Sequence, residues 1–395
     1  MNGGFTRADL SRARSETPGC EQVLHFNNAG ASLMPEPVLD ATVSHLRLEA
    51  AIGGYEAAER SREATERVYD ATAALIGCRS DEVAVIENAT RAWDMAFYSI
   101  PLGPGDRILT AMAEYASNYI AFLQVARKTG AKVEPVPNDE HGQLSVEALR
   151  EMVDERVKLI AITHVPTNGG LVNPAAEVGE VAREAGILYL LDACQSIGQV
   201  PIDVEAIGCD MLSATGRKYL RGPRGTGFLY VRREVLEGLE PPFLDLHAAE
   251  WTARESFEIR ADARRFENWE TNYAGKAGLG VAVDYALGWG IETIWERVRT
   301  LAEDLRSRLG DLPGVEVRDL GAERCGIVTF TVEGRAAEEV SRKLSGEHIN
   351  TSVSPASSTL LDMQDRSLDD LVRASVHYYN TEKEVTRLCE AIERL

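Results

Sequence analysis

Two residues near the middle of the chain have the types and the spacing for chemistry on a carbonyl or an amine. Lys218 stands in the run Thr215-Gly216-Arg217-Lys218, which leads into a glycine-rich turn, and Asp192 ends the apolar segment 187–191. A lysine amine can bond to a carbonyl carbon. A carboxylate at the end of a buried strand lies where open α/β sheets bind ligands. Lys218 alone would read as a surface lysine before a hairpin, and Asp192 is what favours a site.

A strand-end carboxylate and a downstream lysine together meet the needs of pyridoxal phosphate. The lysine condenses with the cofactor aldehyde, and the carboxylate keeps the ring nitrogen protonated so that the ring accepts electrons. With these motifs the sequence resembles the class V aminotransferase group of pyridoxal-phosphate enzymes, which includes cysteine desulfurases, selenocysteine lyases and isopenicillin N epimerases. The resemblance extends from Leu24-His25-Phe26-Asn27-Asn28 to residues 373–381.

This resemblance implies a role for each matching residue around the cofactor. Lys218 would be the Schiff-base lysine, Asp192 the partner of the ring nitrogen, and Gln195 a donor to the phenolic oxygen. Thr215 and Arg217 flank the lysine where relatives usually have Ser and His in contact with the phosphate. An arginine can do the same with a permanent charge and a planar fork.

Two further segments are assigned to the cofactor. Ala89 and Thr90 lie between a strand and an apolar helix, so their amides and the Thr90 hydroxyl can hold a phosphate at a helix N-terminus. An ordinary helix cap is the alternative. Tyr115 stands where relatives stack a histidine on the ring, and its phenol could also donate a proton.

In two loops the sequence does not decide which residue contacts the cofactor. Segment 164–170 matches the place of a polar side chain near the imine, and either Thr167 or Asn168 could fill that role; we assign Asn168. Segment 265–272 corresponds to a loop that, in relatives, reaches the partner's phosphate across a dimer interface. Thr271 is the expected donor, although position 270 also fits. A homodimer is expected on this resemblance.

Two residues are assigned to an amino-acid substrate. Arg373 lies in the apolar segment 370–376, which resembles the strand whose arginine binds the substrate α-carboxylate. A buried arginine needs an anion, and a planar carboxylate fits its fork, although a structural salt bridge is the alternative. Asn28, in the N-terminal motif, is the second substrate contact.

The segment 352–360 bears on the type of reaction because it contains no cysteine. Desulfurases carry a persulfide-forming cysteine on this loop, so that reaction is disfavoured, and Cys325 and Cys389 read as buried, inert thiols. Segments resembling isopenicillin N epimerase-like proteins and ergothioneine-pathway sulfoxide lyases favour a C–S β-lyase. It would act on a cysteine derivative or its sulfoxide and release pyruvate and ammonia. An epimerase, an aminotransferase and a non-catalytic protein that retains the fold are the alternatives.

The elements that position these residues alternate along the chain. Short apolar β-branched runs separated by helical segments predict an α/β protein with parallel strands, and the resemblance implies the pyridoxal-phosphate-dependent transferase fold, fold type I. We expect an N-terminal arm (1–20), a large cofactor-binding domain with a mostly parallel seven-stranded sheet (21–274) and a smaller C-terminal α+β domain (275–395). The strands are predicted at 83–87, 107–112, 132–136, 158–164, 187–192, 211–214 and 227–231.

The composition of the chain limits the classes of partner that it is expected to bind. The 395 residues include 42 Lys+Arg and 62 Asp+Glu, a formal charge of −20, which disfavours binding to nucleic acid and to anionic membrane. No apolar run reaches the roughly 18 residues of a membrane span, and the N-terminus lacks a signal-peptide core. Six scattered cysteines and no metal-ligand spacing of histidines predict a reduced, cytoplasmic compartment and no metal.

Overall fold

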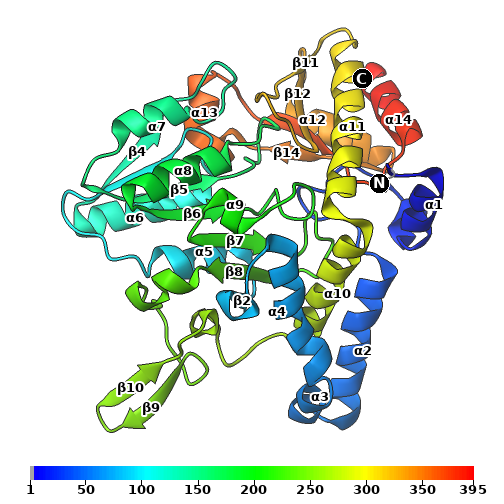
Figure 1. Ribbon diagram of the computed structural model, residues 1–395. Helices are drawn as coiled ribbons and strands as arrows, with labels where there is room; N and C mark the ends of the chain where they lie inside the picture. Colours follow the sequence, from blue (N-terminus) through cyan, green and yellow to red (C-terminus); the bar gives the residue numbers. More distant parts are fainter. Residues whose placement is uncertain (1–3) are drawn as a thin grey trace.

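The computed structural model describes residues 4–395, and its centre is a seven-stranded sheet (Figure 1). The spatial order is β2-β8-β7-β6-β5-β3-β4, and β8 runs antiparallel to both of its neighbours while the other pairings are parallel. The mostly parallel sheet predicted from the sequence is confirmed. Its strands are β2 (Val83–Ile86), β3 (Arg107–Ala111), β4 (Lys132–Val136), β5 (Val157–Thr163), β6 (Leu188–Asp192), β7 (Met211–Thr215) and β8 (Gly227–Val231).

Both faces of this sheet are buried, which explains why its central strands read as continuous apolar runs. Successive side chains of a strand point to opposite faces. Leu190 accordingly packs with helices α5 (Ala89–Phe97) and α6 (Ala116–Thr129), whereas Leu191 packs with α8 (Ala175–Ala185) on the other side. A shift of one residue in register would exchange these two sets, so the packing fixes where each strand ends.

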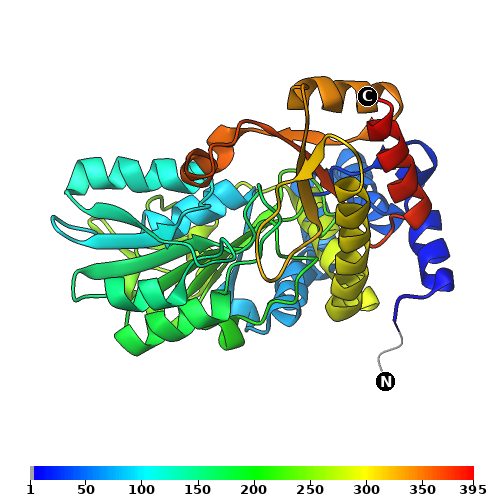
Figure 2. The ribbon, with the colours of Figure 1, turned by 90° about the horizontal axis from the view of Figure 1, so that it is seen from above.

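A smaller antiparallel sheet lies beside the large one (Figure 2). Its order is β11-β12-β15-β14, with β11 (Val315–Val317), β12 (Ile327–Val332), β14 (Ser352–Ser354) and β15 (Leu371–Ser375). The short strand β1 (Leu24–His25) pairs with β13 (Ile349–Asn350). The N-terminal motif that begins at Leu24 therefore lies against the C-terminal part of the chain. The domain boundaries stay a prediction.

Two long helical segments are each divided in two. The first forms α3 (Gly54–Arg60) and α4 (Arg62–Ile76), and the second forms α10 (Tyr273–Trp289) and α11 (Ile291–Gly310). Gly290 separates the second pair with φ of 79°, a left-handed conformation that glycine adopts without penalty. The remaining helices are α1 (Arg7–Ser15), α2 (Glu36–Ile52), α7 (Val146–Met152), α9 (Val204–Ile207), α12 (Ala337–Gly346), α13 (Leu360–Asp365) and α14 (Glu382–Glu393).

A hairpin of β9 (Ala249–Ala253) and β10 (Ser256–Ile259) projects from the body of the molecule (Figure 1). The loop that follows it leads through residues 263–272 into α10, which packs along α2 and α4. Within residues 4–395, no helix combines the length and the apolar character needed to cross a membrane.

Candidate active site

A cavity of about 520 Å³ lies at the carboxyl ends of the parallel strands. Asp192, Thr163 and Thr215 are the last residues of β6, β5 and β7, so the sheet delivers three polar side chains to one place. This is where open α/β sheets bind ligands. The cavity brings together eight residues that the sequence assigned to a cofactor, namely Ala89, Thr90, Tyr115, Asp192, Gln195, Thr215, Arg217 and Lys218.

Lys218 sits in a loop whose backbone is held from both sides. The Arg221 amide donates to the Lys218 carbonyl at 2.9 Å, and the Ser32 amide donates to the Arg217 carbonyl at 3.0 Å. Burial lowers the pKa of the Lys218 ammonium, and the nearby Arg217 guanidinium acts in the same direction. A lowered pKa leaves more of the amine in the neutral form that can attack a carbonyl carbon.

Asp192 faces the same cavity with both carboxylate oxygens held. Oδ1 accepts from the Cys194 amide and Oδ2 from the Asn118 side-chain amide, each at 2.9 Å. The donors are neutral, and no lysine or arginine within residues 4–395 forms an ion pair with Asp192. Its negative charge is therefore available to a cation placed in the cavity.

The opposite end of the cavity is suited to an anion. Asn88 caps α5, and its side-chain oxygen accepts from the Arg91 amide at 2.9 Å. The Ala89 and Thr90 amides have no acceptor in the described part of the chain, so these donors of the helix N-terminus remain for a ligand. Gly227 allows this approach, because a Cβ there would lie 2.6 Å from the Ala214 carbonyl oxygen and 3.2 Å from the Ala89 nitrogen.

Arg373 lies on β15 beside this cavity and is 8% exposed. Its guanidinium donates to the hydroxyls of Thr167, a cavity residue, and Ser352. Burial lowers the pKa of Arg373 to about 10, a sign that its charge has lost much of its hydration. No carboxylate of residues 4–395 pairs with it, so the structural salt bridge considered from the sequence is not formed by the described residues.

The family to which the sequence is matched agrees with this geometry. The model of the family described as "Aminotransferase class-V" matches residues 24–388, which is nearly the whole chain.

The chain belongs to the aminotransferase class-V family.

Relatives and solved structures agree with this membership. A probable cysteine desulfurase of Xylella fastidiosa is 32% identical over 98% of this chain and 95% of its own length. The structure of a cysteine desulfurase from Thermococcus onnurineus NA1 superposes with a TM-score of 0.90 at 25% identity, covering 97% of each chain. The structure of the cystine C–S lyase C-DES, with a TM-score of 0.86 at 23% identity over 95% and 99% of the two chains, shares the fold.

The residues of the cavity fit the pyridoxal 5′-phosphate cofactor of this class-V enzyme. An amine, a carboxylate and a free helix N-terminus lie around one cavity, matching the aldehyde, ring nitrogen and phosphate of the cofactor. The Gln195 amide donates to the Ala29 carbonyl at 3.1 Å, while its Oε1 is buried without a partner within residues 4–395. A buried polar atom without a partner is costly and indicates that a ligand completes the site.

Two of the residues assigned from the sequence do not line the cavity. Asn168 is fully buried, and its amide donates to the Thr359 hydroxyl at 3.0 Å instead of reaching the cavity. Thr167 lines the cavity in its place, because neighbouring residues of the turn point in different directions. Asn28 is also fully buried, and its amide donates to the Ser375 carbonyl at 2.7 Å and accepts from the Tyr379 hydroxyl. It joins the N-terminal segment to β15 and does not line the cavity, and its assignment to the substrate stays a prediction.

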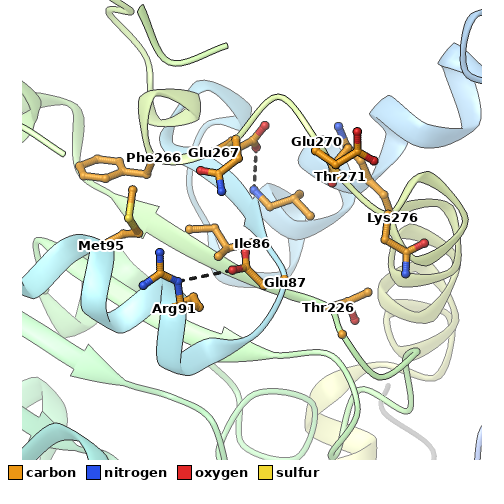
Figure 3. A pocket seen from close by; sticks show the side chains of 14 residues that line it. Ile86, Glu87, Arg91, Met95, Thr226, Phe266, Glu267, Glu270, Thr271 and Lys276 are labelled. Carbon is orange, nitrogen blue, oxygen red and sulfur yellow. Dashed lines mark hydrogen bonds and ion pairs between the residues drawn. The ribbon is translucent and has the colours of Figure 1, made fainter. Parts of the chain in front are cut away.

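Thr271 lies in a different cavity, of about 1000 Å³, beside the start of α10 (Figure 3). It shares this cavity with Glu267 and Lys276, and it is not among the residues that line the Lys218 cavity. Within one chain, Thr271 therefore has no place beside Lys218. Its assignment to a partner's phosphate stays a prediction.

Sequence reasoning missed several residues of the site region, among them the cavity residues Thr163 and Val165. Cys194 lines the cavity between Asp192 and Gln195, a position that their spacing could have indicated. Glu114 and Asn118 lie behind Asp192, outside the cavity. In the sequence, the acid Glu114 next to Tyr115 was only a weak indication that this segment belongs to the site. Arg221 is fully buried and donates to the Leu33 carbonyl and the hydroxyls of Tyr378 and Thr17, which ties the loop after Lys218 to both ends of the chain.

Proposed function

We propose that this pyridoxal-phosphate enzyme is a C–S β-lyase that acts on a cysteine derivative or its sulfoxide and releases pyruvate and ammonia. The observation that carries the proposal is the pairing of Lys218 and Arg373 at one cavity beside a loop without a thiol. Segment 352–360, which includes β14 and contacts Arg373 through Ser352, offers hydroxyl groups only. The names of the relatives, cysteine desulfurase and cystine C–S lyase, support a cysteine-derived substrate.

Pyridoxal phosphate, when bound, supplies an electron sink that stabilises negative charge at the substrate α-carbon. Arg373 would hold the substrate carboxylate with its planar fork and so orient the α-carbon toward Lys218. Lys218 would hold the cofactor through its amine and would also serve as the base for the substrate α-proton. Asp192 would keep the proton on the ring nitrogen, while Ala89, Thr90, Thr215 and Arg217 would hold the phosphate and Gln195 the phenolic oxygen.

Tyr115 is the residue proposed to assist the leaving group. Its side chain lines the cavity and is 37% exposed, so the hydroxyl can reach both the cavity and solvent. A phenol can lie on a ring face and also donate a proton to a departing sulfur. Elimination needs such a donor, because a thiolate or sulfenate leaves more easily once protonated.

The thiols argue for elimination and against persulfide transfer. Cys194 is the cysteine that lines the cavity, and burial raises the pKa of its thiol. Cys325 and Cys389 are buried, and burial raises their pKa values as well. A thiol kept protonated is a poor nucleophile. Sulfur transfer to an enzyme thiol is therefore less well supported than release of the sulfur compound into solution.

The test is incubation of the holoenzyme with S-substituted cysteines and their sulfoxides without any oxo acid. We expect pyruvate and ammonia in equal amounts. Loss of α-deuterium or racemisation without pyruvate would replace the lyase by an epimerase, and turnover that depends on an oxo acid would replace it by an aminotransferase. Persulfide on Cys194, found by mass spectrometry after turnover with cysteine, would establish a desulfurase instead.

We also propose that the enzyme is a cytoplasmic homodimer in which Thr271 completes the partner's phosphate site. The support is that Thr271 lines a cavity that does not include Lys218 of the same chain. Sedimentation of the holoenzyme at micromolar concentration should give a dimer, and Thr271→Ala should weaken cofactor binding without changing the mass. A monomer with full cofactor content would contradict this arrangement.

A further inference from the structure

Asn118 joins two buried carboxylates behind the cofactor cavity. It lies in the first turn of α6, is 3% exposed, and does not line the cavity itself. Its side-chain nitrogen donates to Glu114 Oε1 at 2.8 Å and to Asp192 Oδ2 at 2.9 Å. The two protons of one amide are therefore used on two acids, of which only Asp192 faces the cavity.

Glu114 provides a rigid anchor for that amide. Its Oε2 accepts from the Thr163 amide at 2.9 Å and the Thr110 hydroxyl at 3.1 Å, and its Oε1 accepts from the Thr163 hydroxyl at 2.6 Å and the Tyr115 amide at 3.0 Å. These donors come from β3, the end of β5 and the start of α6. A carboxylate bonded from three elements cannot turn, so the Asn118 amide is fixed in turn.

Burial raises the pKa of Glu114 to about 7, although the hydrogen bonds from Thr163 and Asn118 oppose this shift and the Asp192 charge adds to it. Once the pH exceeds this pKa, the Asn118 amide therefore stands between two carboxylates. Both of its N–H bonds point at them, which is the arrangement that keeps neighbouring carboxylates apart.

Asp192 accepts a side-chain hydrogen bond from Asn118 on one oxygen and a backbone hydrogen bond from the Cys194 amide on the other. Rotation of the Asp192 carboxylate about its Cβ–Cγ bond would break at least one of these two hydrogen bonds. Because both oxygens of Asp192 are held, the lone pairs that remain free keep a fixed direction toward the cavity. An ion pair in a buried site loses strength rapidly when its geometry is lost.

We propose that Asn118 is a positioning residue that fixes the Asp192 carboxylate, and through it the proton on the ring nitrogen of the cofactor. Asn118 does not touch the cofactor and acts through Asp192. The inference rests on the role of Asp192 in the proposed function, but it is independent of which substrate the enzyme takes.

The test compares Asn118→Ala with the wild-type holoenzyme loaded with cofactor labelled with ¹⁵N in the ring. We expect the ring nitrogen to lose its proton at a pH at least one unit lower in Asn118→Ala, seen in its ¹⁵N chemical shift. The dissociation constant of the cofactor should rise about tenfold, the effect of losing one hydrogen bond to a charged group.

Asn380→Ala is the matched control, since Asn380 is equally buried and its amide donates to the His25 carbonyl and to the Glu384 carboxylate, outside the cofactor cavity. It should lower the thermal midpoint while the ¹⁵N titration stays that of the wild type. If Asn118→Ala also changes only the midpoint, the inference is overturned. Asp192→Asn separates the two proposals: a ring nitrogen that stays protonated in this variant would refute the role of Asp192, whereas deprotonation there but not in Asn118→Ala would refute Asn118 alone.

Discussion

The two cavities of the molecule differ in how their charged groups are paired. In the cavity of Figure 3, Glu267 accepts from the Tyr69 hydroxyl and the Val85 amide, each at 2.7 Å, and lies 3.1 Å from His247 Nε2. Lys276 lies 3.3 Å from Glu66 and donates to the Tyr69 hydroxyl at 2.8 Å. Glu267 and Lys276 are therefore both held by partners within the chain.

The Lys218 cavity shows the opposite pattern. Lys218, Arg217 and Arg373 have no carboxylate within 4 Å in the described residues, and Gln195 Oε1 has no partner. Buried charges without partners are costly, so a protein keeps them where a ligand supplies the opposite charge. The comparison shows that pairing, more than cavity size, separates a binding site from a structural cluster, because the paired cavity is the larger one.

The sharpest way to break this comparison is to remove one lysine from the unpaired cavity. Lys218→Met should abolish covalent attachment of the cofactor and lower kcat by at least about 10⁴-fold, because both the bond to the cofactor and the base for the α-proton are lost. Borohydride reduction followed by peptide mapping should label Lys218 in the wild type and no lysine in the variant. A label on another lysine would contradict the assignment.

The same variant has a stability consequence with a definite sign. The folded chain lowers the pKa of Lys218, so the charged form is less favourable in the folded than in the unfolded apoprotein. That penalty is complete below the folded pKa and disappears as the pH rises past the ordinary lysine pKa. Lys218→Met apoprotein should therefore unfold no earlier than wild-type apoprotein at pH 7, by thermal denaturation. Earlier unfolding would mean that Lys218 is also a structural residue.

Arg373→Lys tests the second unpaired cation. Lysine keeps the charge but loses the planar fork, so kcat/KM should fall about 100-fold, equivalent to about 2.7 kcal/mol, while the visible spectrum of the bound cofactor persists. Steady-state kinetics with the substrate found in the pyruvate assay provide the measurement. Unchanged kinetics would show that the bonds to Thr167 and Ser352 are the whole function of Arg373.

The sequence predicted the residues on strand ends better than those in turns. Asp192 and Thr215 could be located because an apolar run fixes the strand, and the strand fixes where its last residue lies. The choice between Thr167 and Asn168 could not be made from the sequence, since nothing in a turn of polar and glycine residues states which side chain points inward; in the structure Thr167 lines the cavity. Asn118 escaped notice because its role depends on two carboxylates from other elements, and no local pattern records such a contact.

Lys276→Met sharpens the comparison from the paired side. Removing this lysine leaves the buried Tyr69 hydroxyl and the partly exposed Glu66 short of one partner each, so the free energy of unfolding should fall by about 2 kcal/mol, mainly through Tyr69. Cofactor affinity should stay within twofold of the wild type. Chemical denaturation and cofactor titration measure the two quantities. A large loss of cofactor with intact stability would place Lys276 in a binding site and remove the contrast between the cavities.

The smallest effect is expected for Tyr115, which lies in the unpaired cavity but carries no charge of its own. Tyr115→Phe keeps the ring that can stack on the cofactor and removes only the hydroxyl, so cofactor affinity should change less than twofold. The rate of pyruvate release should fall about tenfold, because loss of one positioned proton donor costs about 1.4 kcal/mol at the lower end of general-acid effects. Tyr119→Phe, one turn further along α6 and packed near Phe122, is the matched control and should leave both quantities unchanged. The deficit should also shrink for substrates with better leaving groups, such as sulfoxides compared with thioethers, because these need less protonation. An equal deficit for both classes would assign Tyr115 to stacking alone and leave the proton donor to be found elsewhere in the cavity.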